Sequence, residues 1–420
     1  MKYIALLFLL LLPACKNEVA LTPLGSKESY IVQFNEDAPY MALVSLDLKP
    51  NQTGQLNLIS RAESLGTKSQ VFDVQCNEKV IRKTLKHWPV PPNCTQVKWK
   101  VRLDKIEDAK NVRPSEQRSL YMPSGWWVLS GATSLLRVQS ETEDIPIHIT
   151  GSQTSPLLKT VYNQSAPPNF YVIGNAPEAS FTHDSSKITY YGEDLDTVLS
   201  IIKPHQHIKA LNYFKFVIGE EKFRSQNDLS VVWFGAPRER HQASGAAGYD
   251  TIMANYIVGQ DDPKQAEQLL SLMLVFHEQF HQMSSGSHPI WMGESLANYY
   301  ALKALSRAFP DNESERAIWN RFINTQAPPS IGLLDIQKQI IETGNRQNYG
   351  LLYTQGASFW FEIDEAIKTS SSGKLTLDNL MPQIMKLDIS NEDVAFLKLQ
   401  PIIDIVPEAE LRKLKTKYLN

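Results

Sequence analysis

The chain has 420 residues, 42% hydrophobic and 10% aromatic, which allows a large core and exceeds the size of one typical domain. Its 42 Lys and Arg against 45 Asp and Glu give a formal net charge of -3 without a long run of either sign. This balance excludes the basic composition typical of nucleic-acid-binding proteins and does not indicate an acidic substrate.

The N-terminus has the features of an export signal. Lys2 precedes an apolar run over residues 3–12, and small Ala14 stands directly before Cys15. The run is about half as long as the roughly 20 residues of a membrane-spanning helix. Residues 12–15, Leu-Pro-Ala-Cys, resemble the bacterial lipoprotein box, in which the signal is cut before the cysteine and the new N-terminus is acylated. The resemblance implies lipidation of Cys15 and an exported protein anchored in the bacterial cell envelope, with the outer membrane expected; an ordinary cleaved signal is the alternative.

Composition and periodicity divide the chain into four expected parts. A signal peptide over residues 1–14 is followed by a polar tether over 15–28. Residues 29–185 contain short alternating or β-branched runs between turn signals, clearest at 30–34, 42–48, 97–101 and 171–173, which predict a β-sandwich-like domain. Residues 186–420 form the second expected domain.

The two remaining cysteines lie in the β-rich part. Seventeen residues separate Cys76 from Cys94, a spacing that fits no zinc ligand set. In an exported segment the simple interpretation is a structural disulfide, worth about 3 kcal/mol in the chain-entropy model. The sequence leaves open whether they pair.

The second domain begins with a helical period near residue 195, interrupted at Pro204. His205 and His207, beside that proline, are expected at the surface. Strands are predicted at 229–234 and 251–257, and helices dominate afterwards. The whole chain is therefore expected to be α+β, with a mainly helical second domain.

A candidate metal site lies in a long apolar helix predicted over residues 263–283. His277 and His281 are four residues apart on one face, where both imidazoles can bind one zinc ion, and Glu278 projects beside the metal. The alternative is an ordinary helix whose two histidines are solvated and bind no metal. Imidazole and carboxylate groups among Leu, Met, Val and Phe need a partner, however, and a metal supplies one.

Glu294 is the expected third zinc ligand. A Ser/Gly/Pro-rich turn at 286–289 separates the first helix from a second helical pattern, and His281 and Glu294 each lie about one helical turn from it. Antiparallel packing would bring the two side chains to the same height. His288 is a competing ligand in principle, but its place inside the turn favours a loop-surface role.

These motifs resemble the gluzincin zinc peptidases, especially the glycyl aminopeptidase family. The resemblance rests on three segments: His-Glu-Gln-Phe-His at 277–281, Trp-Met-Gly-Glu-Ser-Leu-Ala-Asn-Tyr-Tyr at 291–300 and Tyr-Thr-Gln-Gly-Ala at 353–357. Ser295 stands where the family commonly has glycine, and the connection from His281 to Glu294 is shorter than usual. The resemblance implies a thermolysin-like catalytic domain.

The resemblance and the helical spacing suggest three further site residues. Tyr353 matches the tyrosine that donates a hydrogen bond to the oxyanion in gluzincin aminopeptidases. Asp250 follows a Gly-rich segment in the place of a substrate-facing strand, where it could hold a substrate amine. Asn298, four residues after Glu294, could accept the second ring proton of a ligand histidine or simply lie on the helix surface.

The expected function is hydrolysis of peptide bonds in a peptide or protein substrate, with one zinc ion per chain. Zinc lowers the pKa of its water towards about 7, and Glu278 takes the proton as general base. Whether the enzyme is an aminopeptidase or an endopeptidase stays open. A non-catalytic surface lipoprotein that binds a protein or peptide partner is the alternative, and zinc hydrolysis of a non-peptide bond is a third possibility.

Overall fold

The computed structural model describes most of the chain after the first 28 residues. The described residues are 29–35, 37–48, 56–108, 112–139, 145–150, 158–162, 168–183, 186–219, 228–237, 243–258, 265–284, 288–310, 312–326, 331–387, 389 and 399–420. The lipidation predicted at Cys15, the signal peptide and the tether lie outside these residues and stay predictions. Among the described helices, none is long and apolar enough to cross a membrane.

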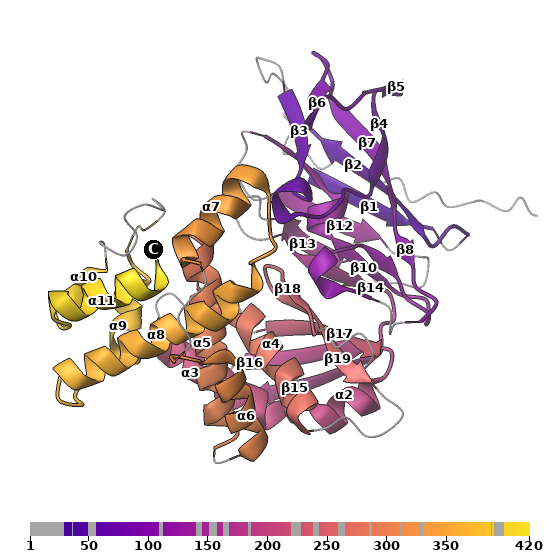
Figure 1. The fold of residues 1–420 in the computed structure, drawn as a ribbon. Coiled ribbons are helices and arrows are strands. Elements are labelled where there is room, and N and C mark those ends of the chain that lie inside the picture. The colour runs from indigo at the N-terminus through magenta and orange to yellow at the C-terminus, as the bar shows by residue number, and fades with distance from the viewer. Residues whose placement is uncertain are drawn as a thin grey trace, which may run out of the picture.

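The N-terminal part consists of three β-sheets (Figure 1). The largest has the order β13-β12-β1-β2-β7-β4-β5, formed by β1 (Ser29–Phe34), β2 (Met41–Asp47), β4 (Val71–Cys76), β5 (Lys79–Val80), β7 (Gln96–Arg102), β12 (Ile145–Thr150) and β13 (Leu158–Tyr162). Two smaller sheets contain β8 (Asp104–Lys105), β9 (Leu120–Tyr121), β10 (Trp127–Ser130) and β14 (Phe170–Ile173), and β3 (Leu56–Ser60), β6 (His87–Val90) and β11 (Leu136–Val138). Short helical turns connect them: η1 (Glu63–Leu65), η3 (Pro114–Glu116) and α1 (Gly131–Ser134).

Alternating side chains create the core of this β-rich part. In β2, Ala42, Val44 and Leu46 are buried while the intervening residues face outward, as expected for a sheet with one covered face. The buried side chains of the large sheet form one hydrophobic cluster with those of both smaller sheets. A disulfide joins Cys76 to Cys94, which is the pairing expected from the sequence.

A five-stranded sheet begins the C-terminal part, in the order β15-β16-β17-β19-β18. It comprises β15 (Glu178–His183), β16 (Ser186–Gly192), β17 (Asp228–Pro237), β18 (Gly245–Ala247) and β19 (Thr251–Val258). The central strands β16, β17 and β19 are parallel, and the predicted strands at 229–234 and 251–257 lie within β17 and β19. β18 forms an edge of this sheet and contacts α4 (Gln265–Met283), the helix that carries His277 and His281.

Helices make up the rest of the described C-terminal part (Figure 1). They are α2 (Leu195–Ile201), α3 (Pro204–Ile218), α4 (Gln265–Met283), α5 (Ile290–Ala308), α6 (Glu313–Phe322), α7 (Leu333–Thr343), α8 (Gly350–Ser370), α9 (Leu377–Ile384), α10 (Gln400–Ile403) and α11 (Glu408–Tyr418). Their apolar faces and one face of the five-stranded sheet share a single core. The α+β class and the order of a β-rich region followed by a helical one are confirmed.

A small apolar cluster and the carboxylate of Glu193 connect the β-rich N-terminal part to the C-terminal part. Apolar residues of β9, β10 and β14 pack against those of β17, β18 and β19. The Glu193 carboxylate also accepts hydrogen bonds from the Ser124 hydroxyl and from the Trp126 indole, the latter at 2.9 Å. β15 precedes the domain boundary expected at residue 186, yet it pairs with β16 in the five-stranded sheet.

The crossing of α5 and α8 is tight at Gly356. A Cβ atom at Gly356 would lie 2.3 Å from the Cβ of Ser295. The Ser295 hydroxyl accepts a 2.7 Å hydrogen bond from the Trp360 indole, so this serine is fixed in the crossing. The contact holds the residue after Glu294 against the helix that carries Tyr353.

Gly356→Ala is therefore expected to lower the free energy of unfolding by about 1–3 kcal/mol, because the added methyl group overpacks the crossing. Gly350→Ala is the matched control, since Gly350 begins the same helix and has open space at its Cβ position. We expect that control to be neutral or slightly stabilising. Urea denaturation followed by circular dichroism measures both, and equal stability of the two variants would contradict the proposed crossing.

Candidate metal centre

The helices α4 and α5 bring three potential metal ligands together. His277 and His281 lie near the C-terminal end of α4, and Glu294 lies in the second turn of α5. The two Nε2 atoms are 3.1 Å apart, and Glu294 Oε2 lies 3.3 Å from that of His277 and 3.5 Å from that of His281. Among the described His, Cys, Asp and Glu side chains, these three are close enough to one another to hold a metal ion. The short connection from α4 to α5 therefore does not prevent the three from meeting.

The spacing of these donor atoms fits zinc. Zinc binds imidazole nitrogen and carboxylate oxygen at about 2.0–2.2 Å in tetrahedral geometry, so two ligand atoms lie about 3.3–3.5 Å apart along each edge. The three observed separations, 3.1, 3.3 and 3.5 Å, match these edges closely. Three protein ligands leave a fourth position for water or substrate, as in catalytic rather than structural zinc sites.

Electrostatics around the three side chains also favour a cation. Burial alone would raise the pKa of Glu294, but His281 and His277 beside it hold that pKa well below its usual range. Burial would likewise lower the pKa of His281, and the Glu294 carboxylate outweighs that effect and raises it. Glu294 is therefore ionised, and positive charge is stabilised between it and the imidazoles.

Tyr349 orients the carboxylate of Glu294, a role not predicted from the sequence. Its hydroxyl donates a 2.8 Å hydrogen bond to Glu294 Oε1, which leaves Oε2 facing the histidines. Such partners fix the orientation of metal ligands. Tyr349 precedes Tyr353 by four residues, so helical spacing from Tyr353 was the available signal.

Glu278 lies against the edge strand β18. A Cβ atom at Gly245 would come within 2.8 Å of Glu278 Cγ and Oε1, so glycine is needed for this close approach. Burial raises the pKa of Glu278, while the neighbouring imidazoles and a hydrogen bond from the Ala247 backbone act in the opposite direction. The carboxylate is thus held at one place beside the ligand group and made more basic than a solvated glutamate.

Tyr353 lies in the first turn of α8, a third helix of the site. Its ring packs edge-to-face on that of His277, with 5.4 Å between centroids, and lies 5.7 Å from the ring of Tyr349. Burial, with Glu294 and Tyr349 nearby, raises its pKa well above the usual range, so the phenol keeps its proton. The Asn298 amide donates a 2.9 Å hydrogen bond to the backbone carbonyl of Tyr353. Asn298 thus touches the turn that carries Tyr353, and its predicted bond to a histidine stays a prediction.

The structure does not bring Asp250 into this group. Its Oδ1 accepts a 2.9 Å hydrogen bond from Thr251, and its backbone N–H donates to Asn169. Its predicted contact with a substrate amine stays a prediction.

The structure also shows where His288 and His207 lie. His288 lies beside the site, with Nε2 3.4 Å from the Met385 sulfur, and is not part of the ligand group. The expectation for His207 was wrong, because it is fully buried between Tyr190 and Gln279. Helical spacing from Pro204 turns it toward α4, and the neighbouring His205 is exposed.

A cleft of about 1090 Å³ opens onto the ligand group. It lies between the two parts of the molecule, since η1 and η3 contribute to one wall and the C-terminal elements to the others. Its lining includes the three ligands and Glu278, Tyr349 and Tyr353. The described site residues thus share one solvent-accessible space.

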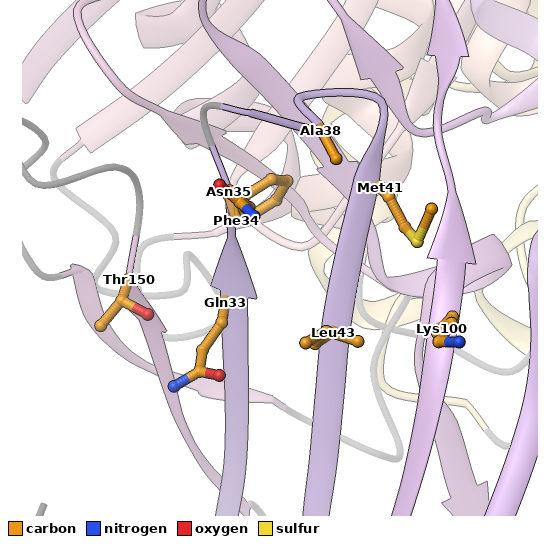
Figure 2. A pocket seen from close by; sticks show the side chains of 8 residues that line it. All are labelled: Gln33, Phe34, Asn35, Ala38, Met41, Leu43, Lys100 and Thr150. Atoms are coloured by element: carbon orange, nitrogen blue, oxygen red, sulfur yellow. The ribbon is translucent and has the colours of Figure 1, made fainter. Parts of the chain in front are cut away.

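A second hollow, of about 510 Å³, lies on the outer face of the large sheet (Figure 2). Figure 2 shows side chains of neighbouring strands along it, among them Gln33, Leu43 and Lys100. The described side chains that line it are amides, apolar groups, one threonine and one lysine, which supply no metal ligand set and no acid–base pair. The cleft between the two parts is therefore the candidate active site.

Comparisons with known proteins identify the fold. No protein-family model and no curated protein matches the sequence. An aminopeptidase N family protein from Idiomarina loihiensis matches in structure with a TM-score of 0.69 and 12% identity, over 93% of this chain and 76% of that one. Legionella pneumophila aminopeptidase A, solved in complex with aspartic acid, matches with a TM-score of 0.52 and 12% identity, over 94% of this chain and 49% of that one. The chain thus spans about half the length of the second protein.

Identities this low show similarity of fold. The shared features are β-rich sheets followed by a helical C-terminal region, as in the aminopeptidase N catalytic domain. In fold, this chain is therefore similar to the aminopeptidase N family of gluzincins, and His277, His281 and Glu294 form a candidate zinc site within it.

Proposed function

We propose that the protein is a zinc-dependent peptidase, with the zinc ion held by His277, His281 and Glu294. The observation that carries the proposal is the spacing of the three ligand atoms, which matches a tetrahedral zinc site. Hydrolysis also needs a general base and room for the substrate. Glu278 beside the ligands could supply the base, and the adjoining cleft the room. The likeness in fold to aminopeptidases supports the same reaction class.

Glu278 is the proposed general base. It would accept a proton from the water that attacks the carbonyl carbon of the peptide and deliver that proton to the leaving amine. Its burial raises its pKa, which suits a group that must both take up and release a proton. When bound, zinc would polarise the carbonyl and lower the pKa of water towards about 7.

Tyr353 is the proposed donor to the developing oxyanion. Its hydroxyl keeps its proton because burial raises its pKa, and its ring packs directly on a ligand histidine. A fixed neutral donor stabilises negative charge that appears only in the transition state. Tyr349 and Asn298 would hold the ligand carboxylate and the Tyr353 backbone in place.

An extended peptide would bind along β18. This strand is an edge of its sheet, and its three residues line the cleft next to Glu278. An edge strand can add a peptide through backbone hydrogen bonds, largely independent of side-chain identity.

A zinc and cleavage assay tests the proposal. We expect calorimetry to show one zinc ion bound per metal-free chain, and a mixed peptide library to be cleaved by the zinc form but not after chelation. His277→Ala should lose stoichiometric binding, whereas His205→Ala, at an exposed position on α3, should retain it. Stoichiometric zinc without cleavage of any peptide would instead support a binding protein.

A further inference from the structure

We propose that the cleft selects peptides with a carboxylate near the scissile bond and that Arg346 binds this carboxylate. The inference rests on the proposed peptidase function and names its substrate class. The carboxylate has two possible sources, the C-terminus of a short peptide or the side chain of Asp or Glu.

The charges of the cleft favour an anionic ligand. Among the described residues that line it, the carboxylates are Glu278 and Glu294, both committed to the metal site, and Arg346 is the one permanently charged cation. With zinc bound and both carboxylates ionised, these groups carry a single net positive charge. A substrate carboxylate therefore enters a field of opposite sign.

Arg346 is exposed on the wall of the cleft and has no carboxylate partner among the described residues. Its guanidinium lies 5.3 Å from the centroid of the Tyr349 ring. On the opposing wall, a Cβ atom at Gly66 would be 3.4 Å from the guanidinium carbon, so the group reaches the backbone of the β-rich part. A guanidinium in this position keeps its N–H groups available, and their planar arrangement matches the two oxygens of a carboxylate.

A single side chain, that of Tyr349, connects Arg346 to the candidate metal site. Tyr349 touches the guanidinium with its ring and Glu294 with its hydroxyl, so one aromatic side chain separates Arg346 from a zinc ligand. An extended peptide advances about 3.3 Å per residue. A carboxylate roughly two or three residues from the scissile bond would therefore reach Arg346.

Among the described residues that line the cleft, none offers an equivalent site for a substrate ammonium group. Asp250 is engaged with Thr251 and does not line it. Gly248 on the adjacent wall cannot be replaced by an acid without clashes, because a Cβ atom there would lie 2.7 Å from the Thr251 carbonyl oxygen. The described lining therefore distinguishes substrates by a negative rather than a positive charge.

The test compares matched peptides on the zinc-loaded protein and on Arg346→Gln. One pair differs in a free or amidated C-terminus, and the other in Glu or Gln two residues from the cleaved bond. We expect the wild type to prefer the carboxylate member of at least one pair, which also identifies the source. Arg346→Gln should raise KM for that member about 10–100-fold with kcat little changed, and should leave its neutral partner unaffected.

Two variants serve as controls. Lys338→Gln removes a positive charge from an exposed position on α7 that does not line the cleft, and should change nothing. Arg346→Lys should restore part of the preference because it keeps the charge but not the paired donors. Binding of the same peptides to zinc-loaded Glu278→Gln protein gives an equilibrium measurement without turnover.

The outcomes separate this inference from the proposed function. Chelator-sensitive cleavage without a preference in either pair would overturn the carboxylate site and leave the peptidase intact. Equal weakening of all peptides by Arg346→Gln, with a lower melting temperature, would assign the arginine a structural role and also overturn the site. Absence of cleavage by the zinc-loaded wild type, with no binding of any peptide to Glu278→Gln, would overturn both.

Discussion

Glu278→Gln is expected to reduce kcat about 10²–10⁴-fold while zinc remains bound, because the amide keeps the shape of the side chain but cannot accept the proton of the attacking water. The ligands are untouched by the change, so one zinc ion per chain should still be found by metal analysis. Activity on a cleaved library peptide, measured at equal zinc content, gives the comparison.

Glu342→Gln is the control for this variant. It removes a carboxylate from an exposed position on α7, outside the cleft, and should retain full activity. If zinc-loaded Glu278→Gln turned over substrate at the wild-type rate, Glu278 would not be the base. If it lost zinc as well as activity, the assignment of Glu278 as a group beside the metal, rather than a ligand, would be wrong.

Lys303→Met is expected to lower the free energy of unfolding by about 3–5 kcal/mol, because it removes the largely buried cation that pairs with two buried carboxylates. Lys303 on α5 contacts Asp364 Oδ2 at 3.0 Å and Asp378 Oδ1 at 2.5 Å, and the Asp364 side chain is 1% exposed. Burial alone would raise the pKa of Asp364, and Lys303 together with the Leu377 backbone holds it below its usual value.

This ion cluster joins four helices around the core of the helical part. The Tyr299 hydroxyl donates to Asp364 at 2.7 Å and the Tyr213 hydroxyl to Asp378 at 3.0 Å, so α3, α5, α8 and α9 meet at two carboxylates. The loss on removing Lys303 is therefore expected to spread through these helices rather than to stay local.

Lys368→Met provides the matched comparison. Lys368 also approaches Asp364, at 3.5 Å, but its side chain is 38% exposed and it pairs with Glu365 at the surface. Its loss should cost no more than about 1 kcal/mol. Urea denaturation followed by circular dichroism measures both variants, and equal effects would show that burial of the cluster is unimportant.

Local sequence patterns were sufficient to predict the helix that carries the two histidines and the strands of the adjoining sheet. Leu269, Met273, Phe276 and Phe280 are buried on α4, as their helical spacing predicted. The same spacing places His277 and His281 on one face of α4. The strands predicted at 229–234 and 251–257 fall within β17 and β19 because their apolar, β-branched runs are buried within a sheet.

Those local patterns could not predict contacts between segments that are distant in the sequence. Tyr349 lies 55 residues from Glu294 in sequence, and its hydrogen bond exists only because α8 packs across α5. Arg346 lies in the segment before α8, and only the folded chain places it beside Gly66. Asp250, chosen by its position after a Gly-rich segment, is turned toward Asn169 and Thr251 instead of the cleft.

The sequence by itself determined the α+β class, the helix α4 and the placing of the candidate metal ligands His277 and His281 on one face of it, because periodicity and residue type depend on neighbours within one element. The sequence also predicted Glu294 as the third ligand, but only the tertiary structure gave its distances of 3.3 and 3.5 Å from the two histidines and showed that Gly245 admits Glu278 to the edge of β18. These contacts depend on how α4, α5, α8 and β18 pack against one another, and packing is set by the whole core rather than by any one segment.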